Sequence, residues 1–254
     1  MTFLALDDRT PRVLIVRPWA TWGLISLCSA VFLLQSVIVL FGGEHLILDH
    51  GLVAATLSGH APLSAQLRPV DPLVTLLTYM FLHGNGWHLA LNLLFLLIFG
   101  DAIEEALGHL RFLVFFLLGG VAAGLAQVVM LPESGLPMIG ASGAVAAVLG
   151  AALVLRPHAR IPVPFRAAPL RVSAVPLLVL WFGFQLFMAL GGAGPNIAWW
   201  AHIGGFLTGV VLVGAFRQSE PRALAPAWRP ATWPASGDRR PHGGTEPSRR
   251  GPWD

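Results

Sequence analysis

Charged residues are scarce in this chain of 254 residues, and lysine is absent altogether. Charged side chains make up 11% of the sequence and hydrophobic ones 55%, with a mean hydropathy of +0.69, whereas an ordinary soluble domain carries roughly 25% charged residues. Water is therefore not the main solvent of this fold. Cys28 is the only cysteine, which excludes disulfide bonds within the chain and cysteine-based metal sites.

Two further patterns are missing. No small-residue cleavage pattern follows the first apolar run, which is long and begins well inside the chain, so a cleavable signal peptide is not expected. No internal repeat of fixed period is visible, which argues against a transporter built from inverted repeats.

Long apolar runs are what the sequence has in place of charge. A helix that crosses the hydrocarbon core of a bilayer needs roughly 20 predominantly apolar residues. One run is interrupted by the polar residues 83–88, so its span is expected only after this interruption. We predict an all-α polytopic membrane protein, a bundle of six transmembrane helices, with spans at residues 22–41, 87–106, 112–131, 138–155, 172–190 and 197–216.

The arginines predict the orientation of these spans, because short loops rich in positive charge stay in the cytoplasm. Three arginines precede the first span, one lies between the second and third, four separate the fourth from the fifth, and seven follow the sixth, whereas only Arg68 falls in an outer loop. Both termini are therefore expected in the cytoplasm. The net charge of +3 follows from this topology, and arginines scattered in this way do not form a nucleic-acid-binding face, so no nucleic acid partner is expected.

Three segments are predicted along the chain. Residues 1–20 form a short cytoplasmic N-terminal segment, residues 21–216 form the six-helix domain, and residues 217–254 form a disordered cytoplasmic tail, because Pro, Arg, Gly and Ser dominate there and cannot bury a core. The first outer loop, about residues 42–72, is long and partly apolar, and we expect it to lie in or on the outer leaflet.

Four polar residues lie near the beginnings of predicted spans. They are His88 and Asn92 in the second span, Ser142 in the fourth and His202 in the sixth. Polar groups at membrane depth are costly unless they are satisfied, so each one is a functional candidate by default. The predicted topology places the starts of these three spans on the outside, so all four residues are expected at a similar depth near the outer leaflet.

Ser142 and His202 suggest a nucleophile and its base. Ser142 follows Gly140 and precedes Gly143 where an outer loop enters a helix, and the first amides of a helix have no partner within it and are available to an oxyanion. Gly205 and Gly209 allow the helix of His202 to approach the small residues that follow Ser142. Taken alone, Ser142 is better explained as a packing or N-capping residue, and His202 also fits an interfacial histidine bonded to backbone.

His88 and Asn92 are four residues apart and share one helix face, from which both can donate hydrogen bonds to a developing negative charge. Separately, each also fits a structural role at the interface or between helices. Together with Ser142 and His202 they complete the set of groups that acyl transfer needs. No Asp or Glu lies in the outer half of any predicted span, so the arrangement has two catalytic residues and no third acid.

Four motifs in this order resemble those of the rhomboid family of intramembrane serine proteases, over about residues 73–216. They are His-x4-His-x3-Asn (His83, His88, Asn92), Gly-x3-Glu-x3-Gly (Gly100, Glu104, Gly108), Gly-Ala-Ser-Gly (residues 140–143) and Ala-His-x2-Gly-x3-Gly (Ala201, His202, Gly205, Gly209). The resemblance implies a six-helix bundle, a Ser142–His202 dyad in a water-filled cavity open to the outside, and an oxyanion hole formed by the Ser142 amide, His88 and Asn92. It implies substrates that are single-spanning membrane proteins, cut near an outer helix end, and Glu104 is expected to be structural.

The sequence departs from this family pattern at two places. Many members carry Trp-Arg in the first loop shortly before the second span, where this chain has Val74 and Thr75. Some members carry an aromatic residue four positions after the serine that packs on the histidine, where this chain has Ala146. Trp199 and Trp200 are candidates to supply ring surface near His202 instead.

Three other functions fit the sequence less well. A transporter or channel would show broken helices in paired halves or several intramembrane charges, which this sequence lacks. A non-catalytic rhomboid-like protein that binds membrane proteins would have Ser142 or His202 replaced, and both are present. A metal or haem site built from His83, His88 and His202 lacks the usual His-Glu-x2-His pattern, so no metal and no cofactor are expected. Abundant Ala, Gly and Pro, with Arg as the only basic residue besides His, suggest a GC-rich bacterial genome. We therefore expect the protein in a bacterial cytoplasmic membrane.

Overall fold

A computed structural model describes Ile15 and residues 17–43, 45–60, 70–163, 170–192, 194 and 197–218. Most of the predicted N-terminal segment and nearly all of the predicted cytoplasmic tail lie outside these residues, so their boundaries stay predictions. The side chains of Pro162 and Val163 are outside the description as well.

Six helices correspond one to one with the six predicted spans. Four of them, α1, α5, α6 and α9, are long and apolar enough to cross a membrane, and α7 and α8 are shorter apolar helices of 14 and 17 residues. The fold class is thus confirmed as an all-α polytopic membrane bundle. The helices are α1 (Trp19–Leu40), α5 (Gly86–Leu107), α6 (His109–Met130), α7 (Ser142–Leu155), α8 (Ala174–Leu190) and α9 (Trp199–Phe216).

Short elements fill the connections. Two antiparallel two-stranded sheets, β1 with β2 and β3 with β4, were not predicted from the sequence. The part of the interrupted run before residue 83 forms a separate short helix that continues as a 3-10 turn, and the span itself begins after the interruption, as predicted. The short elements are α2 (Leu46–His50), β1 (Leu52–Val53), α3 (Ala54–Leu57), α4 (Pro72–Thr78), η2 (Tyr79–Phe81), β2 (Pro137–Met138), β3 (Arg160–Val163) and β4 (Leu170–Ser173).

Local capping explains where the helix of His88 begins and ends. The Asn85 side chain accepts a hydrogen bond of 2.8 Å from the His88 amide, which satisfies one of the unpaired donors of the first turn of α5. At the other end Gly108 has φ +78°, a conformation that favours glycine and ends the helix. The polar segment before α5 therefore supplies the cap of this helix, and His88 lies in its first turn.

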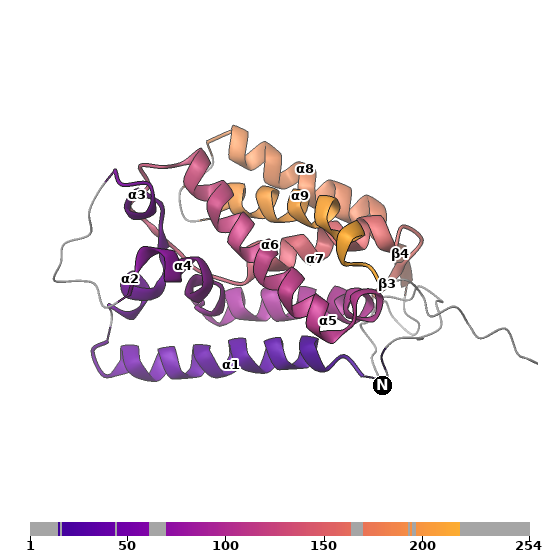
Figure 1. The fold of residues 1–254 in the computed structure, drawn as a ribbon, viewed down its shortest axis with the longest axis horizontal. Coiled ribbons are helices and arrows are strands. Elements are labelled where there is room, and N and C mark those ends of the chain that lie inside the picture. Colours follow the sequence, from indigo (N-terminus) through magenta and orange to yellow (C-terminus); the bar gives the residue numbers. More distant parts are fainter. Residues whose placement is uncertain are drawn as a thin grey trace, which may run out of the picture. The chain divides into compact units, whose positions relative to one another are not determined.

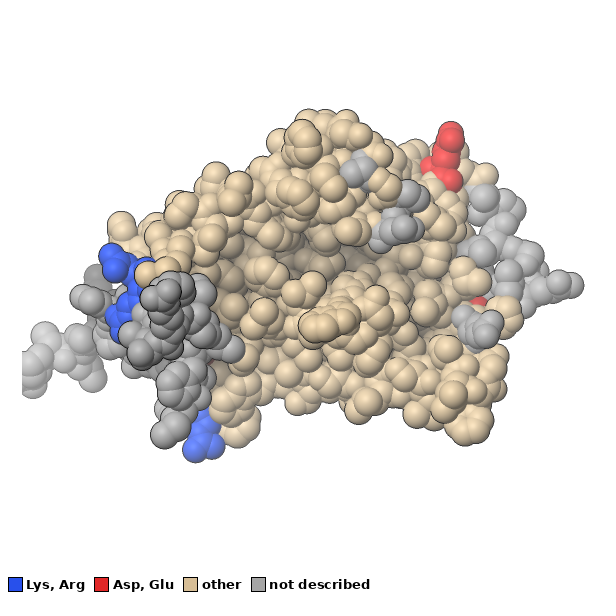
Figure 2. Space-filling model, turned by 180° about the vertical axis from the view of Figure 1, so that it is seen from behind, with Lys and Arg blue, Asp and Glu red and all other residues tan. Residues whose placement is uncertain are grey.

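Helices α5, α7 and α9 run in one direction and α1, α6 and α8 in the other (Figure 1). On the face shown in Figure 2, charged side chains gather at the two ends, and arginines lie at the end that carries the start of α1 and the β3–β4 hairpin. The middle of this face is free of charge over the described residues and is hollowed near its centre. An apolar belt between charged ends is what a bilayer requires of a protein surface.

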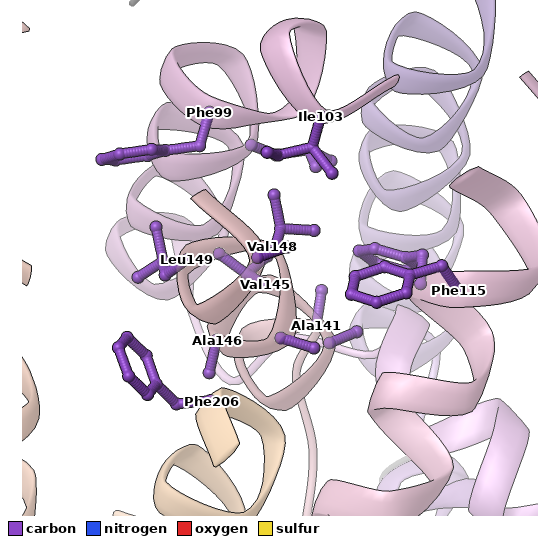
Figure 3. Packing of buried hydrophobic residues seen from close by; sticks show 14 of the residues in the cluster. Phe99, Ile103, Phe115, Ala141, Val145, Ala146, Val148, Leu149 and Phe206 are labelled. Carbon is purple, nitrogen blue, oxygen red and sulfur yellow. The ribbon is translucent and has the colours of Figure 1, made fainter. Parts of the chain in front are cut away.

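Helix α7 is the centre of the bundle. Every residue from Gly143 to Ala152 is buried, and nearly all of them are small. Its side chains meet neighbours on all sides (Figure 3): Val145, Val148 and Leu149 face Phe99 and Ile103 of α5 and Phe115 of α6, and Ala146 faces Phe206 of α9. A helix that is apolar all round can be buried on every side in this way, because it leaves no polar side chain without a partner.

Glycines bring the backbones of α7 and α9 into direct contact. A Cβ atom at Gly205 would overlap the Gly143 carbonyl oxygen, and one at Gly209 would overlap the Ala147 carbonyl oxygen. Small residues four apart allow this close approach in membrane helices, where packing replaces the hydrophobic effect as the source of association. The predicted approach of the two helices is therefore present, and it sets the distance between the start of α7 and the first turn of α9.

Glu104 joins α5 to the beginning of α1. Its fully buried carboxylate accepts hydrogen bonds from the amides of Ala20, at 2.9 Å, and Thr21, at 2.8 Å, and it also contacts His109. A carboxylate at a helix N-terminus satisfies unpaired amides and interacts favourably with the helix dipole. The structure thus gives Glu104 three partners far from the cavity, at the opposite end of α5 from His88.

The described part of the predicted first outer loop is anchored by pairing with the loop that precedes Ser142. β1 pairs with β2, Leu52 opposite Met138, and the Ala55 amide donates to the Ser134 carbonyl at 2.9 Å. Leu52 is buried against α6 near Gly124. Backbone pairing and one buried leucine therefore hold this loop. This chain has Val74 and Thr75 where many rhomboid-like sequences have Trp-Arg.

We expect Glu104→Gln to lower the thermal unfolding midpoint in detergent by about 5 °C or more. The amide keeps one acceptor and turns an NH₂ group toward backbone donors, and a hydrogen bond to a charged group contributes about 1.5–3 kcal/mol. Glu133, an exposed carboxylate, supplies the matched control, because Glu133→Gln makes the same chemical change without these partners. Equal midpoints for the two variants would contradict the anchoring role of Glu104.

Candidate active site

A cavity of about 610 Å³ lies among the starts of α5, α7 and α9 and the end of α8. All four polar residues singled out in the sequence line it, namely His88, Asn92, Ser142 and His202. The remaining wall is mostly apolar and includes the β1–β2 region, so the first outer loop borders the same space. A largely apolar cavity with a few convergent polar groups is the usual form of a binding site.

Ser142 and His202 are in hydrogen-bond contact. Nε2 of His202 lies 2.8 Å from Oγ of Ser142, and both side chains are partly buried. The contact follows from the fold, because Ser142 is the first residue of α7, His202 lies in the first turn of α9, and the glycine contacts hold these two helices together. An imidazole nitrogen at this distance can accept the hydroxyl proton, which is the geometry of an activated serine.

The other ring nitrogen of His202 contacts α8. Nδ1 lies 2.8 Å from Oε1 of Gln185, which is buried with 5% of its surface exposed. Two tryptophan rings lie near the imidazole: Trp181 at 6.0 Å between centroids, tilted by 40°, and Trp199 at 6.4 Å, edge-on. The ring surface near His202 therefore comes from α8 and α9 and not from position 146 of α7. Of the two rings, only Trp199 is a candidate from the sequence.

His88 presents its Nε2 edge to Gly140, two residues before Ser142. The Gly84 amide donates to Nδ1 of His88 at 3.4 Å, so the proton of the neutral ring belongs on Nε2. A Cβ atom at Gly140 would lie 2.6 Å from both Nε2 and Cε1 of His88. Gly140 has φ +117° and donates its amide to the Tyr79 carbonyl at 2.9 Å, which fixes this turn against η2.

Asn92 lies one turn further along α5, on the same face as His88. Its amide nitrogen donates to the His88 carbonyl at 3.1 Å, and the same atom would lie 3.7 Å from a Cβ at Gly140. A side-chain amide nitrogen carries two protons, so this group has a second donor for the cavity that it lines. His88 and Asn92 thus converge beside the turn that leads into Ser142.

His83 lies behind His88, with ring centroids 5.2 Å apart. Its backbone is held by Gln35 of α1, which donates to the His83 carbonyl at 2.7 Å and accepts from the His83 amide at 3.1 Å. Burial, together with the neighbouring His88, lowers the pKa of His83 to about 4, so the ring is neutral at neutral pH. Across the described part of the chain, no group of three His, Cys, Asp or Glu side chains is arranged to hold a metal ion.

Three buried or partly buried glutamines around the site were missed in the sequence. Gln35 holds the backbone of His83, Gln127 of α6 accepts from the Ala201 amide at 3.2 Å, and Gln185 contacts His202. All three lie toward the ends of helices whose ends the predicted topology places outside. The signal was present: the depth argument that selected polar residues at outer helix starts applies equally to outer helix ends.

Comparison with known proteins gives one family. A model of the rhomboid domain matches residues 71–219. The chain is 31% identical over 153 residues to rhomboid protein 1, mitochondrial, of Saccharomyces cerevisiae, covering 54% of this chain and 40% of that protein. It is 34% identical over 140 residues to the rhomboid protease GluP of Bacillus subtilis, covering 55% of this chain and 25% of that protein.

A plant relative gives the same picture, with 32% identity over 137 residues to RHOMBOID-like protein 4 of Arabidopsis thaliana, covering 54% of this chain and 32% of that protein. The chain thus spans between a quarter and two fifths of the length of these three relatives. The matched region contains α5 to α9 and the four polar cavity residues His88, Asn92, Ser142 and His202. The sequence resemblance is therefore confirmed, and this polytopic membrane protein belongs to the rhomboid family.

Proposed function

We propose that this protein is an intramembrane serine endopeptidase in which Ser142 is the nucleophile and His202 is the general base. The observation that carries the proposal is the 2.8 Å contact between Oγ of Ser142 and Nε2 of His202 inside a cavity shared with two further donors. Membership of the rhomboid family and the likeness to a protease of Bacillus subtilis support the same reaction class.

The reaction begins when Nε2 of His202 takes the hydroxyl proton of Ser142 and Oγ attacks a substrate carbonyl carbon. The carbonyl π electrons move onto oxygen, and when the oxyanion collapses, the carbon–nitrogen bond breaks and the leaving amine takes the proton from His202. Water, deprotonated by the same imidazole, then hydrolyses the acyl-enzyme and restores Ser142.

The developing oxyanion is bound by the Ser142 amide, Nε2–H of His88 and the Asn92 side-chain amide. Ser142 begins α7, so its amide belongs to the first turn, where donors have no partner within the helix. His88 and Asn92 approach the same turn from α5. A preorganised donor at such a position contributes about 10²–10³ in turnover in other acyl-transfer enzymes.

The substrates are single-spanning membrane proteins cut near the outer end of their helix. Helical backbone shields its own carbonyl groups by hydrogen bonds, so the cut segment must unwind, and glycine, proline and other weak helix formers favour this. The orientation follows the arginines: Arg17 before α1, Arg111 in α6, Arg156 after α7, Arg171 before α8 and Arg217 after α9 all lie at helix ends remote from Ser142. We assign this end, and both termini, to the cytoplasmic side of a bacterial membrane.

Ser142→Ala is expected to abolish both cleavage of a transmembrane reporter and covalent labelling by a fluorophosphonate, because no oxygen remains to attack. The measurement uses purified protein reconstituted in liposomes, with labelling followed by in-gel fluorescence. Ser36→Ala, which removes an exposed hydroxyl of α1 bonded only within its own helix, is the matched control and keeps both signals.

Two results separate the rival functions. A wild-type chain that folds but neither cleaves nor takes up the probe is a non-catalytic binding protein. A Ser142→Ala chain that still cleaves the reporter contradicts the assignment of the nucleophile.

Gly140→Ala is expected to lower kcat by about 10²-fold, the loss of one oxyanion donor, because the new methyl group displaces the His88 ring and the position requires a positive φ. Gly86→Ala supplies the matched control, since Gly86 begins α5 in open space and without that backbone requirement. The measurement compares kcat for reporter cleavage in the two variants. Equal values would contradict the placement of His88 in the oxyanion hole.

A further inference from the structure

The second ring nitrogen of His202 has a dedicated partner on another helix. Gln185, which precedes His202 by 17 residues, places Oε1 2.8 Å from Nδ1. Its side chain is buried in the second half of α8, which packs antiparallel to the first turns of α9. No Asp or Glu lies in the outer half of any predicted span, and the fold supplies a neutral amide oxygen where a third acid would otherwise stand.

This contact decides which nitrogen of His202 carries the proton. A neutral imidazole has one N–H, and Nε2 must be free of a proton to accept one from the Ser142 hydroxyl. The proton therefore belongs on Nδ1, where it needs an acceptor because the ring is largely enclosed by α7, α8 and α9. Oε1 of Gln185 is that acceptor.

An amide suits this depth better than a carboxylate does. A buried ionised carboxylate without a full set of partners is costly at membrane depth, whereas an amide dipole has no net charge to desolvate. When His202 holds the serine proton, the ring becomes a cation and its Nδ1–H bond to Gln185 becomes charge-assisted and stronger. The amide thus favours the reacting state without placing a permanent charge in the resting cavity.

Neighbouring contacts hold Gln185 and His202 in register. One turn before Gln185, Trp181 lies against both the His202 ring and Phe206, with centroids 6.0 and 6.1 Å away, and Phe182 packs on Phe206 at 4.8 Å. The start of α9 is fixed from the other side by Gln127, which accepts from the Ala201 amide. The His202 ring is therefore positioned by its own helix, by an aromatic contact and by one hydrogen bond.

We propose that Gln185 is a positioning residue that selects the Nδ1–H tautomer of His202 and orients its ring toward Ser142. This inference rests on the proposed serine protease function. Gln185 lines the cavity, and its side-chain hydrogen bond goes to the imidazole of His202. It acts through the imidazole, so we expect its removal to lower the rate of the chemical step more than substrate binding.

The test compares two variants of nearly equal side-chain length. Gln185→Met removes the acceptor, and we expect kcat to fall by about 10²-fold, at the lower limit of what general-base catalysis contributes, with KM changed less than about twofold. Gln185→Glu keeps an acceptor oxygen at the same reach and is expected to retain at least a tenth of wild-type kcat. Leu180→Met, an exposed position of α8, controls for introducing methionine into this helix.

A second readout does not depend on turnover. Nitrogen-15 chemical shifts of histidine-labelled protein, with His202→Ala used to assign the ring, distinguish the two tautomers directly. We expect Nδ1–H in the wild type and a mixture in Gln185→Met. Two results would overturn the role of Gln185. One is a Gln185→Met variant whose His202 tautomer and kcat equal those of the wild type, and the other is a Gln185→Glu variant that is as slow as Gln185→Met. Failure of the proposed function looks different, since the wild type itself would then be inactive while the tautomer comparison still decides on Gln185.

Discussion

The contact between the backbones of α7 and α9 is the constraint on which the rest of the structure depends. Gly205 lies against the Gly143 carbonyl and Gly209 against the Ala147 carbonyl, and no residue larger than glycine fits at either place. Because Ser142 begins α7 and His202 lies in the first turn of α9, this crossing converts two residues 60 positions apart into a hydrogen-bonded pair. In a bilayer close packing is a main source of helix association, which explains why small residues fill the central helix.

Polar groups around this crossing are few, and the structure gives partners to those that form the site. Three glutamines form hydrogen bonds to the backbone or ring of residues at the site, namely Gln35, Gln127 and Gln185. At the other end of the bundle, Glu104 accepts hydrogen bonds from amides at the start of α1. An unsatisfied donor or acceptor is more costly in hydrocarbon than in water, so each of these bonds also fixes geometry. The site is preorganised because its surroundings leave its polar atoms few alternatives.

Much of this arrangement could be predicted from the sequence. Apolar runs gave the six spans, the polar residues at their starts gave the four cavity residues, and Gly205 with Gly209 gave the contact between two helices. The rest depends on tertiary contacts: the depth of a polar residue such as Gln185 marks it as a candidate, but no local signal shows which residue it meets. Trp181 and Gln185 reach His202 only because α8 packs on α9, and β1 pairs with β2 across more than 80 residues of chain. A sequence period shows which face of a helix is apolar and not which neighbour that face meets.

In the proposed mechanism Ser142, His202, His88 and Asn92 act on one reacting centre. A structure of the fluorophosphonate adduct tests this most directly, because the phosphonyl oxygen occupies the place of the oxyanion. We predict a bond from phosphorus to Oγ of Ser142, with the phosphonyl oxygen within hydrogen-bond distance of Nε2 of His88, the Asn92 amide nitrogen and the Ser142 amide. An adduct on another residue, or an oxygen that points away from His88 and Asn92, would contradict it.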